Sequence, residues 1–386
     1  MKRQAGFSLL EVLVSVALML VIMGTTLQML TDAIHANEGV TLLADTQENL
    51  RAAMNYMVHD LVLAGSGIPQ GGITIPNNST IASPNPALAS NVNRPGPLGA
   101  LPTFPVVYQA IPAITAGAAQ GPPATTPNPN IQGATLAGAP TDFITVMYAD
   151  TTLVDVNNHT LNEFPVYLAP GAGPAGCAGG NAAPAGKITA TGNQITFDAT
   201  CITINNGNTS INAGDLLMLQ NALGTTMQTV TGVAGQVVTC ASPDAFALNG
   251  TGKPSGTIIN IQNGIASPGG PYPPTTATRI WMITYYLSIT FPASPLRPML
   301  MRQVNFNAAQ PVGEVLEDLG ITFDINGGPT NTEFVDPAWS PNLIRKVNLS
   351  LAARSETAYS KTKDYFRNNL QTQVSVRSLA FFNQFN

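Results

Sequence analysis

The chain has 386 residues, of which only 10% are charged, with 35 glycines, 31 prolines and a formal net charge of −5. This length accommodates several average domains, or one membrane helix followed by a large exported domain. Because charged residues are few and Gly and Pro are frequent, the composition favours a loop-rich extracytoplasmic β protein over a charged cytosolic enzyme. The negative balance argues against a domain that binds nucleic acid as a whole, because such binding depends on neutralising phosphates.

The N-terminus combines a short basic leader with a long apolar segment. A basic pair at residues 2–3 precedes the small residue Gly6, and Phe7 opens a hydrophobic sequence whose early carboxylate is Glu11. Residues 12–30 carry no charge, and as a helix they would extend about 28 Å. The hydrocarbon core of a bilayer is roughly 30 Å thick, so this segment predicts a membrane-spanning helix. The basic leader would stay in the cytoplasm, with the C-terminal bulk outside.

A secretory signal peptide is the first alternative for this segment. Such a signal ends in a small-residue cleavage site after its apolar run. Here no Ala-x-Ala site follows residue 30, and the helical pattern continues beyond it. The small residue lies before the run, so cleavage after Gly6 would keep the hydrophobic segment on the product, with Glu11 as its fifth residue.

The leader ending in Gly6, the sequence Phe-Ser-Leu-Leu-Glu at residues 7–11 and the apolar run resemble the N-terminal signature of the type IV prepilin family, which includes the pseudopilins of type II secretion. The resemblance implies that a prepilin peptidase cleaves between Gly6 and Phe7 and then N-methylates Phe7. Loss of the leader would leave 14 of the 16 basic residues against 21 acids, a side-chain balance of −7.

The charged side chain of Glu11 makes insertion of this helix into a membrane less favourable in free energy. A lone acid costs about 2.5–3.5 kcal/mol at the bilayer centre on insertion scales, and less near a helix end. In a filament, the free amine of Phe7 on a neighbouring subunit would pair with Glu11, and a charge pair at low dielectric would set the subunit register. The alternative is an interfacial glutamate that reaches the headgroups and has no further role.

The helical pattern continues through residues 31–64, with an apolar stripe and a largely polar opposite side. The stripe consists of Ile34, Leu42, Leu43, Leu50, Met54, Met57, Val58 and Leu61. Gly39 is a point where the helix could bend, and Gly65 followed by a proline ends it. We expect one long helix whose second half packs on an exported sheet, with His35 and His59 at its surface.

Residues 65–140 are rich in Pro, Gly, Ala and Asn, and Arg94 is their only charged residue. Repeated prolines exclude long helices and central strands, although residues 104–109 fit a short strand. The preferred interpretation is a surface loop region laid over the core. The alternative is a ligand or subunit contact surface, because long loops often carry function.

From residue 141 the pattern changes to β-branched and aromatic strand segments. The expected strands cover residues 143–148, 164–168, 187–190, 194–198, 215–220, 227–240, 258–261, 279–291, 299–304, 321–325, 343–352 and 373–381. Residues 312–319, which carry Glu314, Glu317 and Asp318, instead predict a short helix or turn. The fold class expected is therefore α+β, a long helix on an antiparallel β-sheet domain with long Gly/Pro-rich loops.

The order of later motifs narrows the resemblance to PilW-type minor pilins and the J-type pseudopilins. The motifs lie at residues 49–65, 214–217, 228–231, 281–287, 301–302, 315–321, 347–354 and 376–379. The resemblance implies a type IV pilin-like fold. Together with the residue patterns it divides the chain into a leader (1–6), a transmembrane and filament-core helix (7–30), its amphipathic half (31–64), the loop region (65–140) and a β-rich extracytoplasmic domain (141–386).

The sequence offers little for covalent or metal chemistry. Cys177, Cys201 and Cys240 would allow one disulfide and one leftover thiol, with the pairing open. No nucleophile elbow, zinc-protease pair or phosphate-binding loop is present, so no enzyme and no cofactor are expected. Weak calcium candidates are Asp324 and Asn326, with Asp336 nearby, although a tight turn explains this sequence equally well.

The last segment, residues 345–386, is basic, with seven Lys and Arg against two acids. Such a patch could touch lipid headgroups, DNA or an acidic subunit, but a solvated hairpin is the preferred interpretation, and no nucleic-acid partner is predicted.

These patterns and the resemblance give one expected function. It is a minor pilin in the initiation or assembly of a type IV pilus, anchored in the bacterial inner membrane before assembly, with its domain in the periplasm or outside the cell. Its partners would be the prepilin peptidase, other major and minor pilins and the inner-membrane assembly platform. The alternatives are a type II secretion pseudopilin and a membrane-tethered adhesin or binding protein whose loops hold a ligand.

Overall fold

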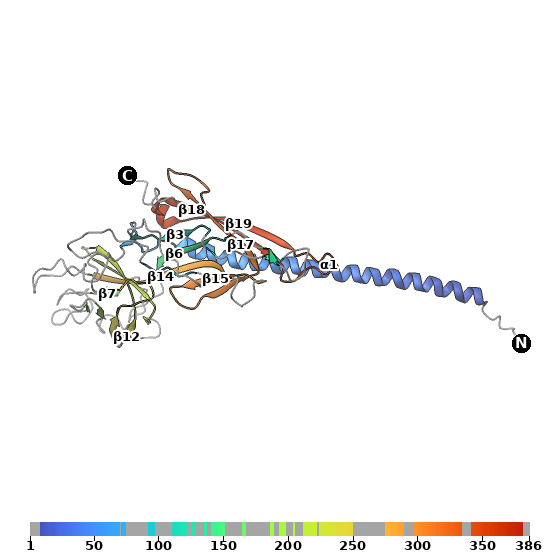
Figure 1. The fold of residues 1–386 in the computed structure, drawn as a ribbon, viewed down its shortest axis with the longest axis horizontal. Helices are drawn as coiled ribbons and strands as arrows, with labels where there is room; N and C mark the ends of the chain where they lie inside the picture. Colours follow the sequence, from blue (N-terminus) through green and yellow to red (C-terminus); the bar gives the residue numbers. More distant parts are fainter. Residues whose placement is uncertain are drawn as a thin grey trace, which may run out of the picture.

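The computed structural model describes residues 8–69, 71–74, 92–96, 110–119, 121, 126–127, 135–136, 140–150, 164–166, 186–188, 193–197, 204, 211–221, 224–249, 275–288, 297–333 and 341–380. The fold is α+β and pilin-like. One long helix packs with its C-terminal half on antiparallel sheets, while its N-terminal half extends away from them (Figure 1).

Helix α1 runs from Leu9–Leu63 without interruption. Ser8 caps its first turn, because the side-chain oxygen accepts a hydrogen bond from the backbone N–H of Glu11. At the other end Gly65 adopts a φ of +80°, a left-handed conformation that glycine reaches without strain. The predicted terminator is therefore confirmed, and the helix stays continuous through Gly39.

The C-terminal half of α1 supplies one apolar stripe to the largest core. Its buried apolar residues follow the helical spacing expected for one face: Leu50, Ala53, Met54, Met57 and Leu61. They pack against apolar side chains from two sheets, including Ile144 and Leu349. Figure 1 shows this part of the helix between strands of the two sheets, and its neighbours include β16 (Gln310–Glu314) and β19 (Arg367–Ser375).

The larger sheet is built around β14 (Thr275–Ser288), a strand of 14 residues. Its partners are all antiparallel. The first half of β14 pairs with β10 (Leu216–Asn221) and β7 (Phe164–Val166), and the second half with β15 (Met299–Val304) and β6 (Phe143–Ala149). The sheet extends outward through β11 (Gly224–Thr229), β16 (Gln310–Glu314) and β3 (Ile114–Gly117).

A second sheet of three antiparallel strands lies against the helix. It consists of β17 (Leu316–Ile325), β18 (Ile344–Arg354) and β19 (Arg367–Ser375), flanked by η2 (Pro341–Leu343) and the short α3 (Arg377–Ala380). Asp142 connects the two sheets, because its carboxylate accepts hydrogen bonds from the backbone N–H groups of Ala119 and Ile321.

Three smaller pairings complete the described strands. A four-stranded sheet has the order β12 (Gly232–Ala234), β13 (Val237–Thr239), β9 (Gln194–Phe197) and β8 (Gly186–Ile188). Two short pairs are β1 (Ile73–Thr74) with β2 (Ala110–Ile111) and β4 (Thr126–Pro127) with β5 (Thr135–Leu136).

The prediction of a helix or turn at residues 312–319 was wrong. These residues end β16 and begin β17, with Val315 between them at a φ of +55°. The acids that suggested a short helix or turn include Glu317, whose side chain is only 8% exposed because it pairs with Arg354 and Arg367. The acidic residue Glu317, which contributed to the helix prediction, therefore forms ion pairs between strands.

The preferred interpretation of residues 65–140 as a covering loop was wrong for part of that segment. β3 belongs to the larger sheet and pairs with β6. Arg94 is fully buried, and its guanidinium donates to the hydroxyl of Thr145 and to the carbonyl oxygens of Thr115 and Ala116. The short strands expected at 104–109 and 258–261 lie outside the described residues.

Candidate functional site

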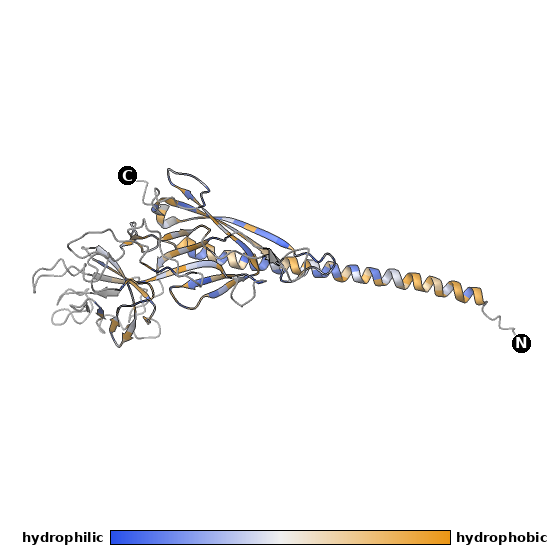
Figure 2. Ribbon diagram, viewed as in Figure 1, coloured by the Kyte–Doolittle hydropathy of each residue, from blue (hydrophilic) through white to orange (hydrophobic). Residues whose placement is uncertain are grey.

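The N-terminal half of α1 is the most unusual surface of the molecule. Every residue from 8 to 34 is exposed, and Figure 2 shows this part of the helix predominantly in the colour of hydrophobic residues. Its exposed large apolar side chains include Leu13, Leu18, Leu20, Ile22 and Leu30. Soluble proteins rarely expose a continuous apolar surface of this size, which normally marks a membrane or protein contact.

This segment is long and apolar enough to cross a membrane. Within α1 an 18-residue window reaches a mean hydropathy of 2.2, and none of it is buried inside the protein. A buried core helix would pass the same composition test but would be covered by its own domain. The exposed segment is therefore the part of the described chain that needs an apolar environment from outside.

Hydroxyl groups on the exposed half are satisfied within the helix itself. Ser15 donates to the carbonyl oxygen of Val12, and Thr26 donates to that of Ile22, at 2.9 and 2.8 Å. Thr31 bonds in the same way to Leu27. Such back-bonding leaves few unsatisfied polar groups, which is the condition for a helix surrounded by lipid or by other apolar helices.

Glu11 lies in the first turn of α1, exposed and directly after the Ser8 cap. A carboxylate at this position is favoured by the partial positive charge of the helix N-terminus. Among the residues that the structure describes, no cation forms an ion pair with Glu11. Gly6 and Phe7 precede the described part of the chain, so cleavage, methylation and the pairing of Glu11 with the amine of Phe7 stay predictions.

The exposed half meets the folded domain at a polar junction around residues 32–38. The hydroxyl of Ser360 contacts the carboxylate of Glu38 and lies 2.8 Å from Nδ1 of His35, and the Ser360 backbone N–H donates to Glu38 at 3.1 Å. The hydrogen bond from Ser360 lowers the pKa of Glu38. His35 is therefore partly covered, whereas His59 is exposed as predicted.

A buried polar cluster fixes the other end of the helix. Asp60 is 1% exposed and accepts hydrogen bonds from the hydroxyls of Tyr148 and Tyr285. Arg302 on β15 donates to both carboxylate oxygens, with Nε at 2.7 Å from Oδ2. Burial raises the pKa of Asp60, but the hydrogen bonds from Arg302 and Tyr285 outweigh it, so the net pKa is lowered.

This cluster joins the helix to three strands of the domain, because its partners come from β6, β14 and β15. Sequence reasoning missed it. The available signal was an acid within the apolar stripe, flanked at helical spacing by Met57 and Leu61. The arrangement holds the exposed half of α1 at a fixed angle to the domain.

The predicted cysteine chemistry is tested only in part. Cys240 is a free, buried thiol, and burial raises its pKa to about 12. The structure therefore does not pair Cys240 with Cys201. Cys177 and Cys201 lie outside the described residues, so a bridge between these two stays a prediction.

The residues predicted as weak calcium candidates do not share one environment in the structure. Asp324 accepts hydrogen bonds from the side-chain amides of Asn348 and Gln373 and from the backbone N–H of Asn331. Asn326 is exposed, and Asp336 lies outside the described residues. Within the described part of the chain no group of three or more His, Cys, Asp or Glu is placed to hold a metal ion.

Most basic residues of the C-terminal segment contact other groups of the same chain. Arg354 and Arg367 pair with Glu317, and Lys361 pairs with Asp32 on α1. Arg345 donates to backbone carbonyl oxygens, including that of Leu379, and Lys346 donates to Gln373. Much of the positive charge at this end is therefore engaged within the chain.

Comparison with known proteins locates one match, at the N-terminus. Residues 1–27 match the family model described as the prokaryotic N-terminal methylation motif. No curated protein and no solved structure showed a significant match to the chain. Together, the prepilin-type motif and a membrane-capable helix on an antiparallel β domain support a type IV pilin or pseudopilin that is processed by prepilin peptidase, a structural protein rather than an enzyme.

Proposed function

We propose that the chain is a minor pilin of the PilW type that takes part in the initiation or assembly of a type IV pilus. The observation that carries the proposal is the N-terminal half of α1. It is apolar, every residue from 8 to 34 is exposed, and residues 9–27 lie within the segment that matches the prepilin-type motif. A helix that its own domain leaves uncovered needs either lipid or the helices of other subunits around it.

In this proposal the exposed half has two successive environments. Before assembly it spans the inner membrane, with the β domain on the periplasmic side. After the peptidase cuts between Gly6 and Phe7, the helix leaves the bilayer and joins a bundle of equivalent helices. The apolar surface then remains covered, so the transfer exchanges one apolar environment for another and exposes little apolar area to water.

Glu11 selects the register of that bundle. It has no ion-pair partner in the described part of its own chain, and its position in the first turn leaves its carboxylate free to meet the amine of Phe7 on a neighbouring subunit. Because both groups are shielded from water in the bundle, an unpaired Glu11 would cost several kcal/mol. Misaligned subunits would therefore be excluded.

A strain that lacks the gene, complemented with the wild type or with Glu11→Ala, tests the assembly role. We expect wild-type protein in sheared filaments, and Glu11→Ala protein at normal level in the membrane fraction but strongly reduced in the filament fraction. Thr41→Ala, on an exposed position of the same helix, is the matched control. Equal filament incorporation of Glu11→Ala and wild type would contradict the proposed role of Glu11.

The same N-terminal motif serves pseudopilins of type II secretion, which are the second candidate. The two functions differ in the phenotype of the deletion strain. Loss of surface pili with normal protein secretion supports the pilus, whereas loss of secretion with normal pili would replace the proposal by the pseudopilin.

A further inference from the structure

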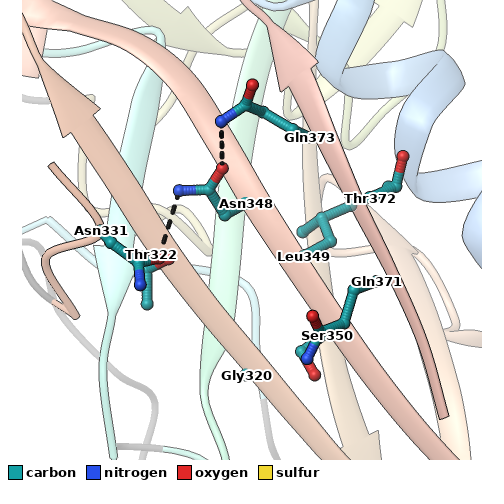
Figure 3. Close-up of a pocket in the computed structure, with 9 residues that line it drawn as sticks. All are labelled: Gly320, Thr322, Asn331, Asn348, Leu349, Ser350, Gln371, Thr372 and Gln373. Atoms are coloured by element: carbon teal, nitrogen blue, oxygen red, sulfur yellow. Dashed lines mark hydrogen bonds between the residues drawn. The ribbon is translucent and has the colours of Figure 1, made fainter.

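The outward face of the β17–β18–β19 sheet contains a shallow hollow that the assembly function does not use. Its volume is about 530 Å³, and Figure 3 shows that its lining residues come from the three strands and from Asn331, which follows β17. Most of the side chains that line it are neutral and able to hydrogen bond: Thr322, Asn331, Asn348, Ser350, Gln371, Thr372 and Gln373, beside Gly320 and the buried Leu349. None of these lining residues belongs to the exposed half of α1.

Strand register explains why these groups gather on one face. Thr322 is paired with Asn348, and Asn348 with Gln373, so they form one row across the sheet. The next row joins Gly320, Ser350 and Gln371. Because residues two apart on a strand share a face, both rows point outward, while the intervening apolar residues point into the core.

The second row rises less far above the sheet than the first row, because two of its three residues, Gly320 and Ser350, are small. Gly320 has no side chain and Ser350 has a short one, which opens the floor between the larger amides. A Cβ built at Gly320 would meet the Cβ of Ser350 at 3.7 Å, an ordinary van der Waals contact. The hollow at this position therefore results from the absence of a side chain at residue 320, because the backbone there could carry a larger residue without a clash.

Asp324 holds the amides of the first row in fixed orientations. Its carboxylate accepts from Nδ2 of Asn348 at 3.1 Å and from Nε2 of Gln373 at 3.2 Å. The same amide of Gln373 also donates to Oδ1 of Asn348 at 2.8 Å (Figure 3). A carboxylate can only accept here, so it assigns which end of each amide is the donor and leaves the row ordered before any ligand arrives.

The second row keeps its hydrogen-bonding capacity. Within the described part of the chain, the side chains of Ser350 and Gln371 have no hydrogen-bond partner, and Nδ2 of Asn331 has none either. A hydroxyl, a complete amide and an amide donor are thus available beside the ordered row. Together they present donors and acceptors at short spacing on a nearly flat surface.

The chemistry of the lining selects the class of ligand. A protein partner would be expected to cover apolar or aromatic side chains, and a lipid would need an apolar surface. A nucleic acid or anionic glycan would need an excess of basic groups, whereas the first row is bonded to one carboxylate, that of Asp324, and to one ammonium, that of Lys346, which donates to Oε1 of Gln373 at 3.1 Å. We propose that this face binds a neutral carbohydrate, whose adjacent hydroxyl groups match the mixed donors and acceptors of Ser350, Gln371 and Asn331.

Binding is tested on the purified full-length chain in a detergent without a sugar headgroup. Cellotetraose, mannotetraose and chitotetraose are each titrated at millimolar concentration by saturation-transfer NMR. We expect at least one of them to bind with millimolar affinity, because no aromatic ring lines the hollow to add stacking. A sulfated tetrasaccharide should bind no more tightly than the neutral one, because Asp324 and Lys346 give the row no excess of positive charge.

Two variants and one control assign binding to the hollow. Gly320→Val fills the floor while raising strand propensity, and Gln371→Ala removes the free amide. We expect each to weaken binding about tenfold, or ~1.4 kcal/mol. Ser375→Ala, exposed at the end of β19 and outside the hollow, should bind like the wild type.

Absence of binding by all three neutral sugars would overturn the proposal, as would unchanged binding by both variants or stronger binding of the sulfated sugar. The measurement uses no filament. It therefore stands or falls independently of the proposed assembly function.

Discussion

The Asp60 cluster makes the attachment of the helix to the sheets quantitatively testable. Asp60→Asn keeps the shape of the side chain but leaves Arg302 without its carboxylate. Breaking a buried ion pair by removing one partner costs about 3–5 kcal/mol. Arg302 is 26% exposed, and the asparagine oxygen can still accept a hydrogen bond from one tyrosine. We therefore expect a loss at or below the lower end of this range, about 2–3 kcal/mol.

Thermal unfolding of the full-length chain in detergent measures this loss. For a folded unit of this size the entropy of unfolding is roughly 0.7 kcal/mol per kelvin, so the midpoint should fall by about 3–4 °C. Asn55→Ala, at an exposed position of the same helix, is the control and should change stability by less than ~0.5 kcal/mol. A shift in Asp60→Asn no larger than in this control would refute the account of the cluster.

The same pair of proteins gives a pH prediction. The pKa of Asp60 is lower in the folded protein than in the unfolded chain, where it is about 3.9. A group of this kind stabilises the fold fully above its unfolded pKa, and the contribution is lost as the pH falls through the lower folded pKa. The stability difference between wild type and Asp60→Asn should therefore be constant near neutral pH and shrink below about pH 4. A difference that stays constant there would contradict the ion pair.

Three further predictions concern the core, one glycine and the free thiol. The side chain of Met57 is fully buried against the sheets, so Met57→Ala should lower the free energy of unfolding in urea by about 2–5 kcal/mol. Val62 is partly exposed on the same helix, and Val62→Ala should lower it by less than ~1 kcal/mol. Equal losses in the two variants would contradict the packing of Met57. Gly117→Ala should lower the melting temperature, because its Cβ would lie 2.7 Å from the Phe143 ring and 2.8 Å from the Phe143 carbonyl oxygen. An unchanged melting temperature would contradict this close packing. Cys240 should resist iodoacetamide in the folded protein and react after denaturation, because its thiol is buried with a pKa of about 12. Mass spectrometry of its tryptic peptide measures the labelling. Rapid labelling of the native protein would place the thiol at the surface.

The long helix and most strands could be predicted from the sequence because their signals are local, although the strand predicted at residues 373–381 was wrong beyond Ser375, where β19 ends and α3 follows. The apolar stripe through Met54 and Met57 has helical spacing, and Gly65 marks the end. Residues 299–304 follow Pro295 and Pro298, which separate them from the preceding strand, and β15 occupies the same six positions. In each case the local pattern and the tertiary packing favour the same structure.

The remaining features depend on contacts between distant residues. No residue near Asp60 in the sequence indicates which group it pairs with, because Arg302 lies 242 positions away. Arg94 appeared as an isolated charge in a loop-like segment, yet it is buried because the carbonyl groups of β3 and the ring of Phe143 surround its guanidinium. Glu317 was predicted to lie in a short helix or turn, because Arg354 and Arg367 reach it only when β17, β18 and β19 pair.

The helix thus divides into a half that the domain fixes and a half that it leaves uncovered. The buried stripe and the Asp60 cluster belong to the first, and the apolar surface with Glu11 belongs to the second. This division explains how one continuous element can anchor a β domain and still present a complete helical surface to lipid or to other subunits.

The central claim is that the chain is processed as a prepilin before its helix assembles. Mass spectrometry of the N-terminal peptide from the membrane fraction, in strains with and without the prepilin peptidase, tests it most directly. The account predicts a peptide that begins with N-methylated Phe7 in the first strain and an uncut leader in the second. An N-terminus at Met1 or Lys2 in both strains would show an unprocessed membrane anchor and contradict the claim.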